Sequence, residues 1–294
     1  MTDTLVLSVD GMGGDAAPEI VVEGIDIAAK RRGDIRFLIH GEAARIEALM
    51  ARHPDAKAVS QIVPAEKTIG MEVKASQALR QGKGSSLWNA VAAVENGEAN
   101  AVVSAGNTGA FMAISMFRFR TMEGVHRPAL TTRWPCIKGG YTVMLDVGAN
   151  VEADSEQLVE FAIMGEAFAR AVSGIPKPSV GLLNVGAEEQ KGHEEIRAAA
   201  ALIRAAGFDM DFRGFVEGDD IAKGTVDVVV TDGFTGNIAL KTGEGTARLV
   251  AHYLREALTG GLMAKLGALI AYPALRKLRN RMDPGSFNGA VFLG

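Results

Sequence analysis

The chain has 294 residues, of which 48% are hydrophobic, 22% charged and 6% aromatic, and 31 Lys and Arg against 35 Asp and Glu give a net charge of −4. This composition is that of a folded globular protein and excludes long disorder, and the small negative charge excludes a global basic field for nucleic acid. The single cysteine, Cys136, cannot form an internal disulfide, and nothing nearby would activate it as a nucleophile. The first residues also lack the pattern of a signal peptide. We therefore expect a cytoplasmic enzyme or binding protein.

Strand and helix patterns alternate along the chain. Apolar strands are expected at 4–9, 35–39, 58–63, 101–104, 141–145, 179–183 and 226–230. Helices are expected after Pro18, at 42–51, after Ser85, at 155–172, from after Gly192 to about residue 206, and from Thr235 onward. Residues 68–84 are polar and partly irregular. This alternation predicts a mostly parallel sheet with helices on both faces.

Polar residues stand where the expected strands end. They are Asp10, His40, Ser104, Asp146, Asn184 and Thr231. A single polar strand end is usually only a turn, but ligands of such sheets bind beyond the carboxyl ends of the strands. The repetition therefore predicts that these residues line one active-site rim.

Two of these strand ends share one pattern. Residues 101–110 and 228–237 both run from paired valines through a hydroxyl residue to Gly-x-Thr-Gly at the start of a helix. Glycines let the backbone approach a ligand, and helix N-terminal N–H groups carry a positive partial charge. The pattern is typical of a phosphate-binding cleft.

The chemistry of the rim is limited by what the sequence lacks. It contains no His- or Cys-rich metal cluster, no Gly-x-Ser-x-Gly elbow and no phosphate loop of the Gly-x4-Gly-Lys type, and residues 11–15 fail the dinucleotide fingerprint. Phosphate is itself a competent nucleophile that needs mainly positioning and oxyanion stabilisation. Lys191 could act as a cationic clamp and Asn237 could donate an amide hydrogen bond; the alternative for Lys191 is a solvated loop lysine.

Five motifs in this order resemble one family. They are Asp10-Gly11-Met12-Gly13-Gly14-Asp15, Ser104-Ala105-Gly106-Asn107-Thr108-Gly109-Ala110, Asp146-Val147-Gly148-Ala149-Asn150, Leu182-Leu183-Asn184-Val185-Gly186 with Lys191-Gly192, and Thr231-Asp232-Gly233-Phe234-Thr235-Gly236-Asn237. Each is weak alone, but their joint order is specific. From Val6 to its last residues the chain resembles the acyl carrier protein:phosphate acyltransferase (PlsX) family of bacterial phospholipid synthesis.

The resemblance implies transfer of a fatty acyl group from acyl carrier protein to inorganic phosphate, giving acyl phosphate for a glycerol-3-phosphate acyltransferase. It implies a Rossmann-like three-layer α/β/α fold related to phosphotransacetylases, one catalytic domain over 1–294, a homodimer, and no metal or cofactor. Lys191 and Asn237 match family positions implicated in catalysis. Substrate and phosphate contacts are carried over to Asp10, Gly13, Gly14, Ser104, Asn107, Thr108, Gly109, Asp146, Asn150, Asn184, Thr231, Asp232, Thr235 and Gly236.

The mechanism we expect places phosphate on Ser104, Asn107, Thr108 and the helix N-terminus. Phosphate attacks the thioester carbonyl, Lys191 and Asn237 stabilise the oxyanion, and the thiolate leaves with little acid assistance because a thiol has a pKa of about 8.5. Two departures from the family pattern stand out. Position 11 is glycine rather than alanine or valine, and the chain stops where relatives continue, so we expect a truncated C-terminal end.

A second candidate surface lies in an expected helical hairpin at 255–281. Its apolar run is shorter than the roughly 20 residues that cross a bilayer. Apolar and basic residues could instead contact an anionic membrane or acidic acyl carrier protein: Leu262, Leu266, Leu269, Ile270, Arg276, Lys277, Arg279 and Arg281. The alternative is a dimer or core helix with solvated basic residues. The resemblance favours peripheral membrane association.

Two other functions remain open at the level of sequence. A phosphotransacetylase-like enzyme would move short acyl groups between coenzyme A and phosphate on the same rim, without a carrier-docking patch. A membrane-surface scaffold on a retired enzyme fold would need no catalytic residues, which the presence of Lys191 and Asn237 opposes.

Overall fold

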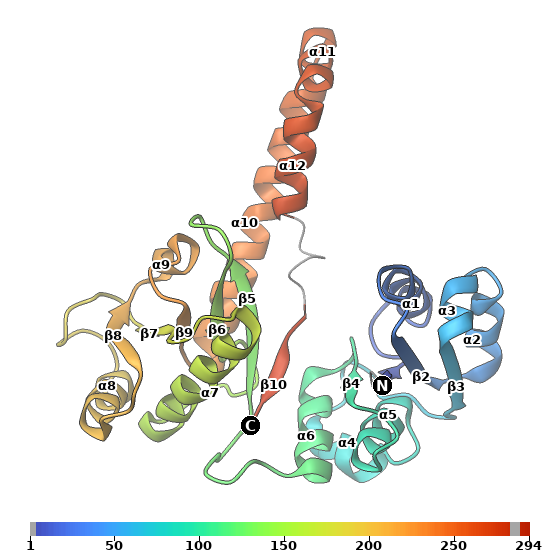
Figure 1. Cartoon of the computed structure of the whole chain (residues 1–294), viewed down its shortest axis with the longest axis horizontal. Helices are drawn as coiled ribbons and strands as arrows, with labels where there is room; N and C mark the ends of the chain where they lie inside the picture. Colours follow the sequence, from blue (N-terminus) through green and yellow to red (C-terminus); the bar gives the residue numbers. More distant parts are fainter. Residues whose placement is uncertain (1–3, 283–288) are drawn as a thin grey trace. The chain divides into compact units, whose positions relative to one another are not determined.

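The computed structural model describes residues 4–282 and 289–294 of the chain. Contacts within the chain divide it into two compact units, Met1–Thr121 and Met122–Gly294, which are described separately. The single catalytic domain expected over 1–294 concerns both units together and stays a prediction. The elements of both units are labelled in Figure 1.

Unit 1 has a parallel four-stranded sheet in the order β3-β2-β1-β4. Its elements are β1 (Leu5–Asp10), α1 (Glu19–Arg31), β2 (Ile35–Gly41), α2 (Ala43–Met50), α3 (Pro54–Val59), β3 (Ser60–Pro64), α4 (Ala75–Gln81), α5 (Ser86–Glu95), β4 (Ala101–Val103) and α6 (Thr108–Phe119). Helices α1, α2 and α3 share one hydrophobic cluster with β1 and β2, and α4, α5 and α6 share another with β4. Unit 1 is thus a three-layer α/β/α structure.

The alternation of side chains along β2 explains its two environments. Ile35, Phe37 and Ile39 pack in the cluster with α1, α2 and α3. His40 points the other way: its Nε2 lies 3.0 Å from Ser8 Oγ, which donates to Ala90 O in α5 at 2.8 Å. Burial disfavours the charged form of an imidazole and lowers the pKa of His40.

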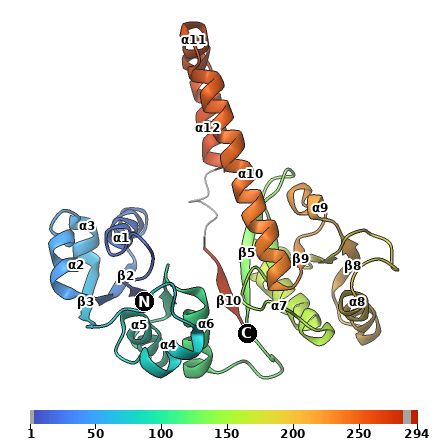
Figure 2. The same cartoon turned by 180° about the vertical axis from the view of Figure 1, so that it is seen from behind.

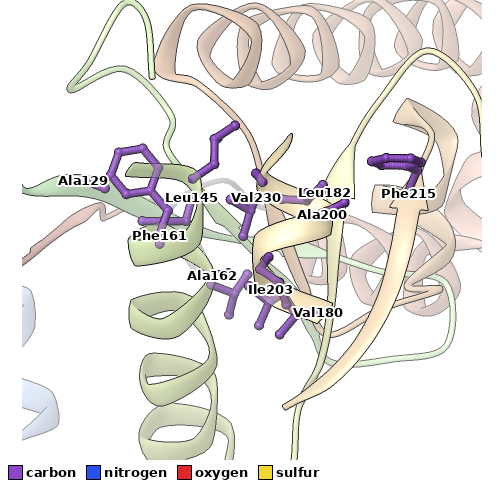
Figure 3. Packing of buried hydrophobic residues seen from close by; sticks show 14 of the residues in the cluster. Ala129, Leu145, Phe161, Ala162, Val180, Leu182, Ala200, Ile203, Phe215 and Val230 are labelled. Atoms are coloured by element: carbon purple, nitrogen blue, oxygen red, sulfur yellow. The ribbon is translucent and has the colours of Figure 1, made fainter. Parts of the chain in front are cut away.

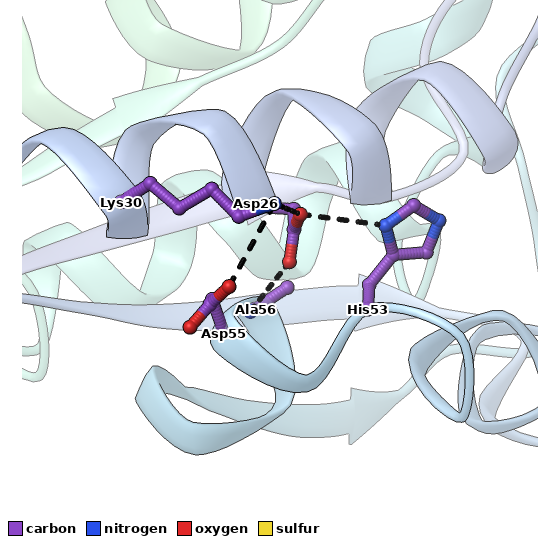
Figure 4. Close-up of polar contacts among 5 residues, drawn as sticks. All are labelled: Asp26, Lys30, His53, Asp55 and Ala56. Carbon is purple, nitrogen blue, oxygen red and sulfur yellow. Dashed lines mark hydrogen bonds and ion pairs between the residues drawn. The ribbon is translucent and has the colours of Figure 1, made fainter.

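A polar cluster ties α1 to α3 (Figure 4). Asp26 is 6% exposed, and its carboxylate lies 2.5 Å from Lys30 Nζ and accepts a hydrogen bond from Ala56 N at 3.1 Å. His53 Nδ1 lies 3.7 Å from the same carboxylate, and Lys30 Nζ lies 3.7 Å from Asp55. Lys30 is the main cause of the lowered pKa of Asp26. The buried charge is therefore paired and hydrogen-bonded, as burial requires.

Unit 2 has a six-stranded sheet in the order β10-β5-β6-β9-β7-β8. Its elements are β5 (Ala129–Pro135), β6 (Tyr141–Leu145), α7 (Ser155–Ser173), β7 (Ser179–Leu183), α8 (Glu194–Ala206), β8 (Asp211–Val216), α9 (Gly218–Lys223), β9 (Val228–Val230), α10 (Gly233–Thr259), α11 (Leu262–Ile270), α12 (Tyr272–Met282) and β10 (Val291–Leu293). β6, β9, β7 and β8 are parallel, whereas β5 runs antiparallel to both β6 and β10.

Both faces of the central strands of unit 2 are buried. Val228 and Val230 join the cluster under α7 and α8, which is drawn in Figure 3, whereas Val229 packs on the opposite face with residues of α9 and α10. This explains why the strand is a continuous valine run instead of an alternating one. Figure 2 shows α10 passing across the side of the sheet opposite to α7. Unit 2 is also a three-layer α/β/α structure.

The last helices of unit 2 carry exposed apolar side chains. α11 follows α10 after Gly260-Gly261 and packs against it. Leu262, Leu266, Leu269 and Ile270 are between 52% and 85% exposed. Arg276 and Lys277 are exposed on α12, whereas the side chains of Arg279 and Arg281 lie outside the described residues. In the described part of the chain, no helix combines the length and apolarity needed to cross a membrane.

The two sheets correct one expectation from the sequence. Asp10, His40 and Ser104 follow strands of the unit 1 sheet, whereas Asp146, Asn184 and Thr231 follow strands of the unit 2 sheet. The prediction of one rim on one sheet was wrong, because β4 pairs only with β1 among the described strands and ends the first sheet. The mostly parallel α/β architecture with helices on both faces is confirmed.

Candidate functional site

The carboxyl end of β1 meets the carboxyl end of β4 in unit 1. Ser104 Oγ donates to Asp10 Oδ2 at 2.8 Å and accepts from Gly106 N at 3.0 Å. Gly13 lies between them: a Cβ at this position would be 2.5 Å from Asp10 Oδ2 and 2.9 Å from Gly106 N. Only glycine fits this close approach, so the glycine-rich loop after β1 and the turn after β4 are held together. Gly14 follows with a φ of +102° and lies in the same loop.

Asn107 is the N-cap of α6, and its side chain is committed to local structure. Its Oδ1 accepts from Ala110 N at 3.0 Å, while its Nδ2 donates to Val73 O at 2.8 Å and Met71 O at 2.9 Å. These bonds attach the irregular segment before α4 to the start of α6. Thr108, in the first helical turn, is exposed.

The first turn of α6 keeps unpaired backbone groups. An α-helix provides no internal acceptor for its first N–H groups. Asn107 satisfies the N–H of Ala110, which leaves those of Thr108 and Gly109 directed out of the helix end. The exposed Thr108 hydroxyl and these amides together form a concentration of donors.

Asp146 is the centre of the corresponding region in unit 2. It is 0% exposed. Its Oδ1 accepts from the backbone N–H groups of Leu130, Gly148 and Ala149 at 3.0 to 3.1 Å. Its Oδ2 accepts from Asn150 N at 2.7 Å and Asn150 Nδ2 at 2.9 Å. Asp146 thus ties β5, β6 and the following loop together, and both of its oxygens are occupied within the protein.

The first turn of α10 packs directly on this loop. Gly233 N donates to Asn150 O at 2.8 Å, and a Cβ on Gly233 would overlap the same oxygen. A Cβ on Gly236 would overlap the backbone oxygen of Asp146. Asp232 is the N-cap: Oδ1 accepts from Thr235 N and Oδ2 from Thr235 Oγ1, both at 2.8 Å. The two glycines are therefore required by the backbone of the neighbouring loop.

Asn237 lies one residue beyond this contact and is exposed. A Cβ on Gly148 would be 3.7 Å from the Asn237 side chain, so the two positions are neighbours. Among the described residues, Thr231 Oγ1, Asn150 Oδ1 and Asn184 Oδ1 are buried acceptor atoms without a hydrogen-bond partner. They follow three adjacent strands of the sheet: Asn150 comes after β6, Thr231 after β9 and Asn184 after β7.

Lys191 lies in the loop after β7. Asn184 Nδ2 donates to Lys191 O at 3.0 Å. Gly192 has a φ of +88°, and a Cβ on it would overlap Asn184 Oδ1. Lys191 Nζ lies 2.8 Å from Glu188 Oε1. Glu188 raises the pKa of Lys191, so the ammonium is charged at neutral pH.

The sequence-predicted residues therefore form two groups. Unit 1 brings together Asp10, Gly13, Gly14, Ser104, Asn107, Thr108 and Gly109. Unit 2 brings together Asp146, Asn150, Thr231, Asp232, Thr235, Gly236 and Asn237, while Asn184 and Lys191 follow β7, the strand next to β9. Groups of three or more His, Cys, Asp or Glu side chains that could hold a metal ion are absent from the described residues.

Sequence reasoning missed Glu188 as the partner of Lys191. The spacing of three residues between opposite charges was a usable signal, because one turn of chain brings such side chains to the same side. The structure has that turn: Lys191 N donates to Glu188 O at 3.1 Å. The contact of Asp146 with Leu130 N could not have been found, because β5 was not among the expected strands.

Comparison with known protein sequences shows the family of this chain. A family model described as "Fatty acid synthesis protein" matches residues 5–294. The phosphate acyltransferase of Caulobacter vibrioides is 59% identical over 294 residues, covering 100% of this chain and 81% of that protein. The chain belongs to the phosphate acyltransferase family. The phosphate acyltransferase of Paramagnetospirillum magneticum is 54% identical and covers 100% of this chain and 84% of that protein.

Solved structures support the fold of this phosphate acyltransferase family member. A phosphotransacetylase from Streptococcus pyogenes matches with a TM-score of 0.63 at 17% identity, covering 84% of this chain and 83% of that one. The EutD phosphotransacetylase from Staphylococcus aureus matches with a TM-score of 0.59 at 16% identity, covering 83% and 82%. The expected relation to the phosphotransacetylase fold is confirmed.

Proposed function

We propose that this protein transfers a fatty acyl group from the thioester of acyl carrier protein to inorganic phosphate. The observation that carries the proposal is the 59% identity, over the whole chain, to a protein named phosphate acyltransferase. Phosphate oxygen forms the new bond to the acyl carbon, the carbon–sulfur bond breaks, and the carrier thiol leaves. The product is an acyl phosphate, which a glycerol-3-phosphate acyltransferase would consume in phospholipid synthesis.

Phosphate is proposed to bind at the N-terminus of α6. The support is the exposed Thr108 hydroxyl beside the N–H groups of Thr108 and Gly109, because helix N-termini favour anions. Ser104 contributes by holding the turn to Asp10. Asn107 contributes as the cap that fixes this helix end, since its side-chain hydrogen bonds are already made within the protein.

Lys191 and Asn237 are proposed to stabilise the oxyanion that develops on the thioester carbonyl. Lys191 supplies a protonated ammonium, and Asn237 supplies an exposed amide beside Gly148. Preorganised donors of this kind stabilise transition-state charge more than ground-state charge. Asp146, Asn150, Asp232 and the glycines contribute by fixing the backbone from which Asn237 projects.

The test is release of free carrier thiol from palmitoyl carrier protein by the purified chain. We expect release only when phosphate is present, and formation of acyl phosphate in equal amount. Faster phosphate-dependent turnover of acyl coenzyme A than of acyl carrier protein would favour the phosphotransacetylase-like alternative. No phosphate-dependent turnover of either substrate would contradict the proposal. Removal of one oxyanion donor costs about 100- to 1,000-fold in kcat in other enzymes, and we expect a loss of this order for Lys191→Ala.

Peripheral membrane contact is proposed for the last helices, in a cytoplasmic homodimer. The support is the cluster of exposed apolar side chains on α11, including Leu266 and Leu269, followed by exposed Arg276 and Lys277 on α12. Flotation with anionic liposomes should fall on Leu266→Asp and on Arg276→Gln with Lys277→Gln. Unchanged flotation of both variants would contradict membrane contact. The Arg276→Gln, Lys277→Gln variant separately tests docking of acidic acyl carrier protein.

A further inference from the structure

The loop between β7 and α8 pairs the proposed oxyanion residue with a carboxylate. Lys191 Nζ lies 2.8 Å from Glu188 Oε1, and both side chains are about half exposed, 49% and 51%. We propose that Glu188 is a positioning residue, whose carboxylate holds the Lys191 ammonium in the free protein and competes for it with the oxyanion that develops on the thioester carbonyl. This inference rests on the proposed function, because it assigns a regulator to the same site.

The geometry of the loop is fitted to this pair. A Cβ on Gly186 would be 2.5 Å from Lys191 Cδ, 3.0 Å from Lys191 Nζ and 2.7 Å from Glu188 Oε2, so any side chain at 186 would displace both members. The buried Asn184 fixes the other end by donating to Lys191 O. Gly192, at a φ of +88°, leaves space for the Asn184 amide that a Cβ would fill. Three positions thus constrain where Lys191 lies.

The electrostatics allow Glu188 to be displaced. Each partner favours the charged form of the other: Glu188 raises the pKa of Lys191, to which Glu217 adds, and Lys191 lowers the pKa of Glu188. A half-exposed ion pair in water changes an equilibrium only about two- to fivefold, so the negative charge that develops on the thioester oxygen can replace the carboxylate. The neighbouring Glu189 pairs with Arg204 at 3.2 Å instead and is a matched control.

The first experiment measures kcat for phosphate-dependent thiol release at low ionic strength, with both substrates saturating. Removing the competing carboxylate in Glu188→Gln should raise kcat by about two- to fivefold, from the strength of such pairs, with KM for inorganic phosphate within about twofold. Glu189→Gln should leave both constants unchanged. In a Lys191→Ala background, Glu188→Gln should no longer raise kcat. An unchanged kcat for Glu188→Gln, or an equal increase in both backgrounds, would overturn the inference, since the second result indicates only a general charge effect.

The second experiment needs no turnover. The titration of the Lys191 ammonium is followed by NMR of a 13C label at its Cε, and Glu188→Gln should shift the titration to lower pH while Glu188→Asp restores much of the shift. A chain without phosphate-dependent activity but with this shift would contradict the proposed function and leave the pairing intact. Activity with phosphate but no shift on Glu188→Gln would overturn the role of Glu188 alone.

Discussion

Replacement of Asp146 by asparagine tests the central contact of unit 2. The carboxylate accepts five hydrogen bonds, four of them from backbone N–H groups, and is fully buried. In Asp146→Asn, the remaining oxygen can keep the three donors now on Oδ1. The new NH2 group then faces Asn150 N and Asn150 Nδ2, which are both donors.

The expected loss follows from those two donors. A buried donor left without an acceptor costs about 1–3 kcal/mol, so two predict a loss of about 2–6 kcal/mol in the free energy of unfolding. Asn150 cannot turn its unpartnered Oδ1 toward the new amide without a further loss, because its Nδ2 also donates to Pro128 O at 2.8 Å. A loss in this range is a large fraction of a typical domain stability of about 5–15 kcal/mol.

The two tryptophans allow this measurement for each unit. Trp134 lies on β5 in unit 2 and Trp88 on α5 in unit 1. In a Trp88→Phe background, urea unfolding followed by Trp134 fluorescence reports unit 2 alone. Asp211→Asn, which removes a partly exposed ion pair with Arg213, serves as the control. A loss below about 1 kcal/mol for Asp146→Asn, the scale of one ordinary hydrogen bond, would refute the structural role.

Three other predictions follow from contacts described above. Gly236→Ala should destabilise unit 2 by at least about 1–3 kcal/mol, the usual cost of overpacking, whereas Gly245→Ala in the same helix meets nothing within 4 Å and should be neutral or stabilising; equal urea midpoints would contradict this. Because burial lowers the pKa of His40, unit 1 should lose stability as pH falls below about 6.5, and His40→Gln should lose less. If unfolding followed by Trp88 fluorescence gave the same pH dependence for the wild type and His40→Gln, His40 would have no such role. His126 has the opposite sign: Glu160 raises its pKa, so its stabilisation is present below about pH 6.5 and lost as pH rises through the raised value. After correction for the intrinsic pH dependence, amide hydrogen exchange at 122–128 should speed up with pH more in the wild type than in His126→Asn. The same increase in exchange rate in both proteins would count against a stabilising His126–Glu160 pair.

Local patterns predicted most of the parallel strands and helices. Strands at 35–39, 141–145 and 179–183 agree with β2, β6 and β7 within two residues, because each is a buried apolar run followed by a polar turn. β5 and β8 were not expected. β5 contains Thr131, Thr132 and Arg133 and ends in proline, and β8 contains Gly214 at a φ of +81°.

The candidate site was predictable in its residues but not in their contacts. Cap positions are local, so the two turns were found from spacing alone. The contact of Asp10 with Ser104 joins residues 94 positions apart, and the contact of Asp146 with Leu130 depends on an antiparallel strand that the periodicity did not reveal. The division into two sheets also depends on which strands pair, and the strand runs that were expected all have the same apolar character.

The N-caps of α6 and α10, Asn107 and Asp232, differ by one charge, and they lie at different positions of the matching turns: Asn107 is within Gly-x-Thr-Gly, whereas Asp232 precedes it. Asn107 closes α6 with a neutral oxygen, while Asp232 closes α10 with a carboxylate. A carboxylate offsets the positive end of a helix, whereas an amide leaves that potential available to a bound ion. The repeated turn has therefore diverged in electrostatic character, and the neutral cap leaves the N-terminus of α6 better suited to an anion than that of α10.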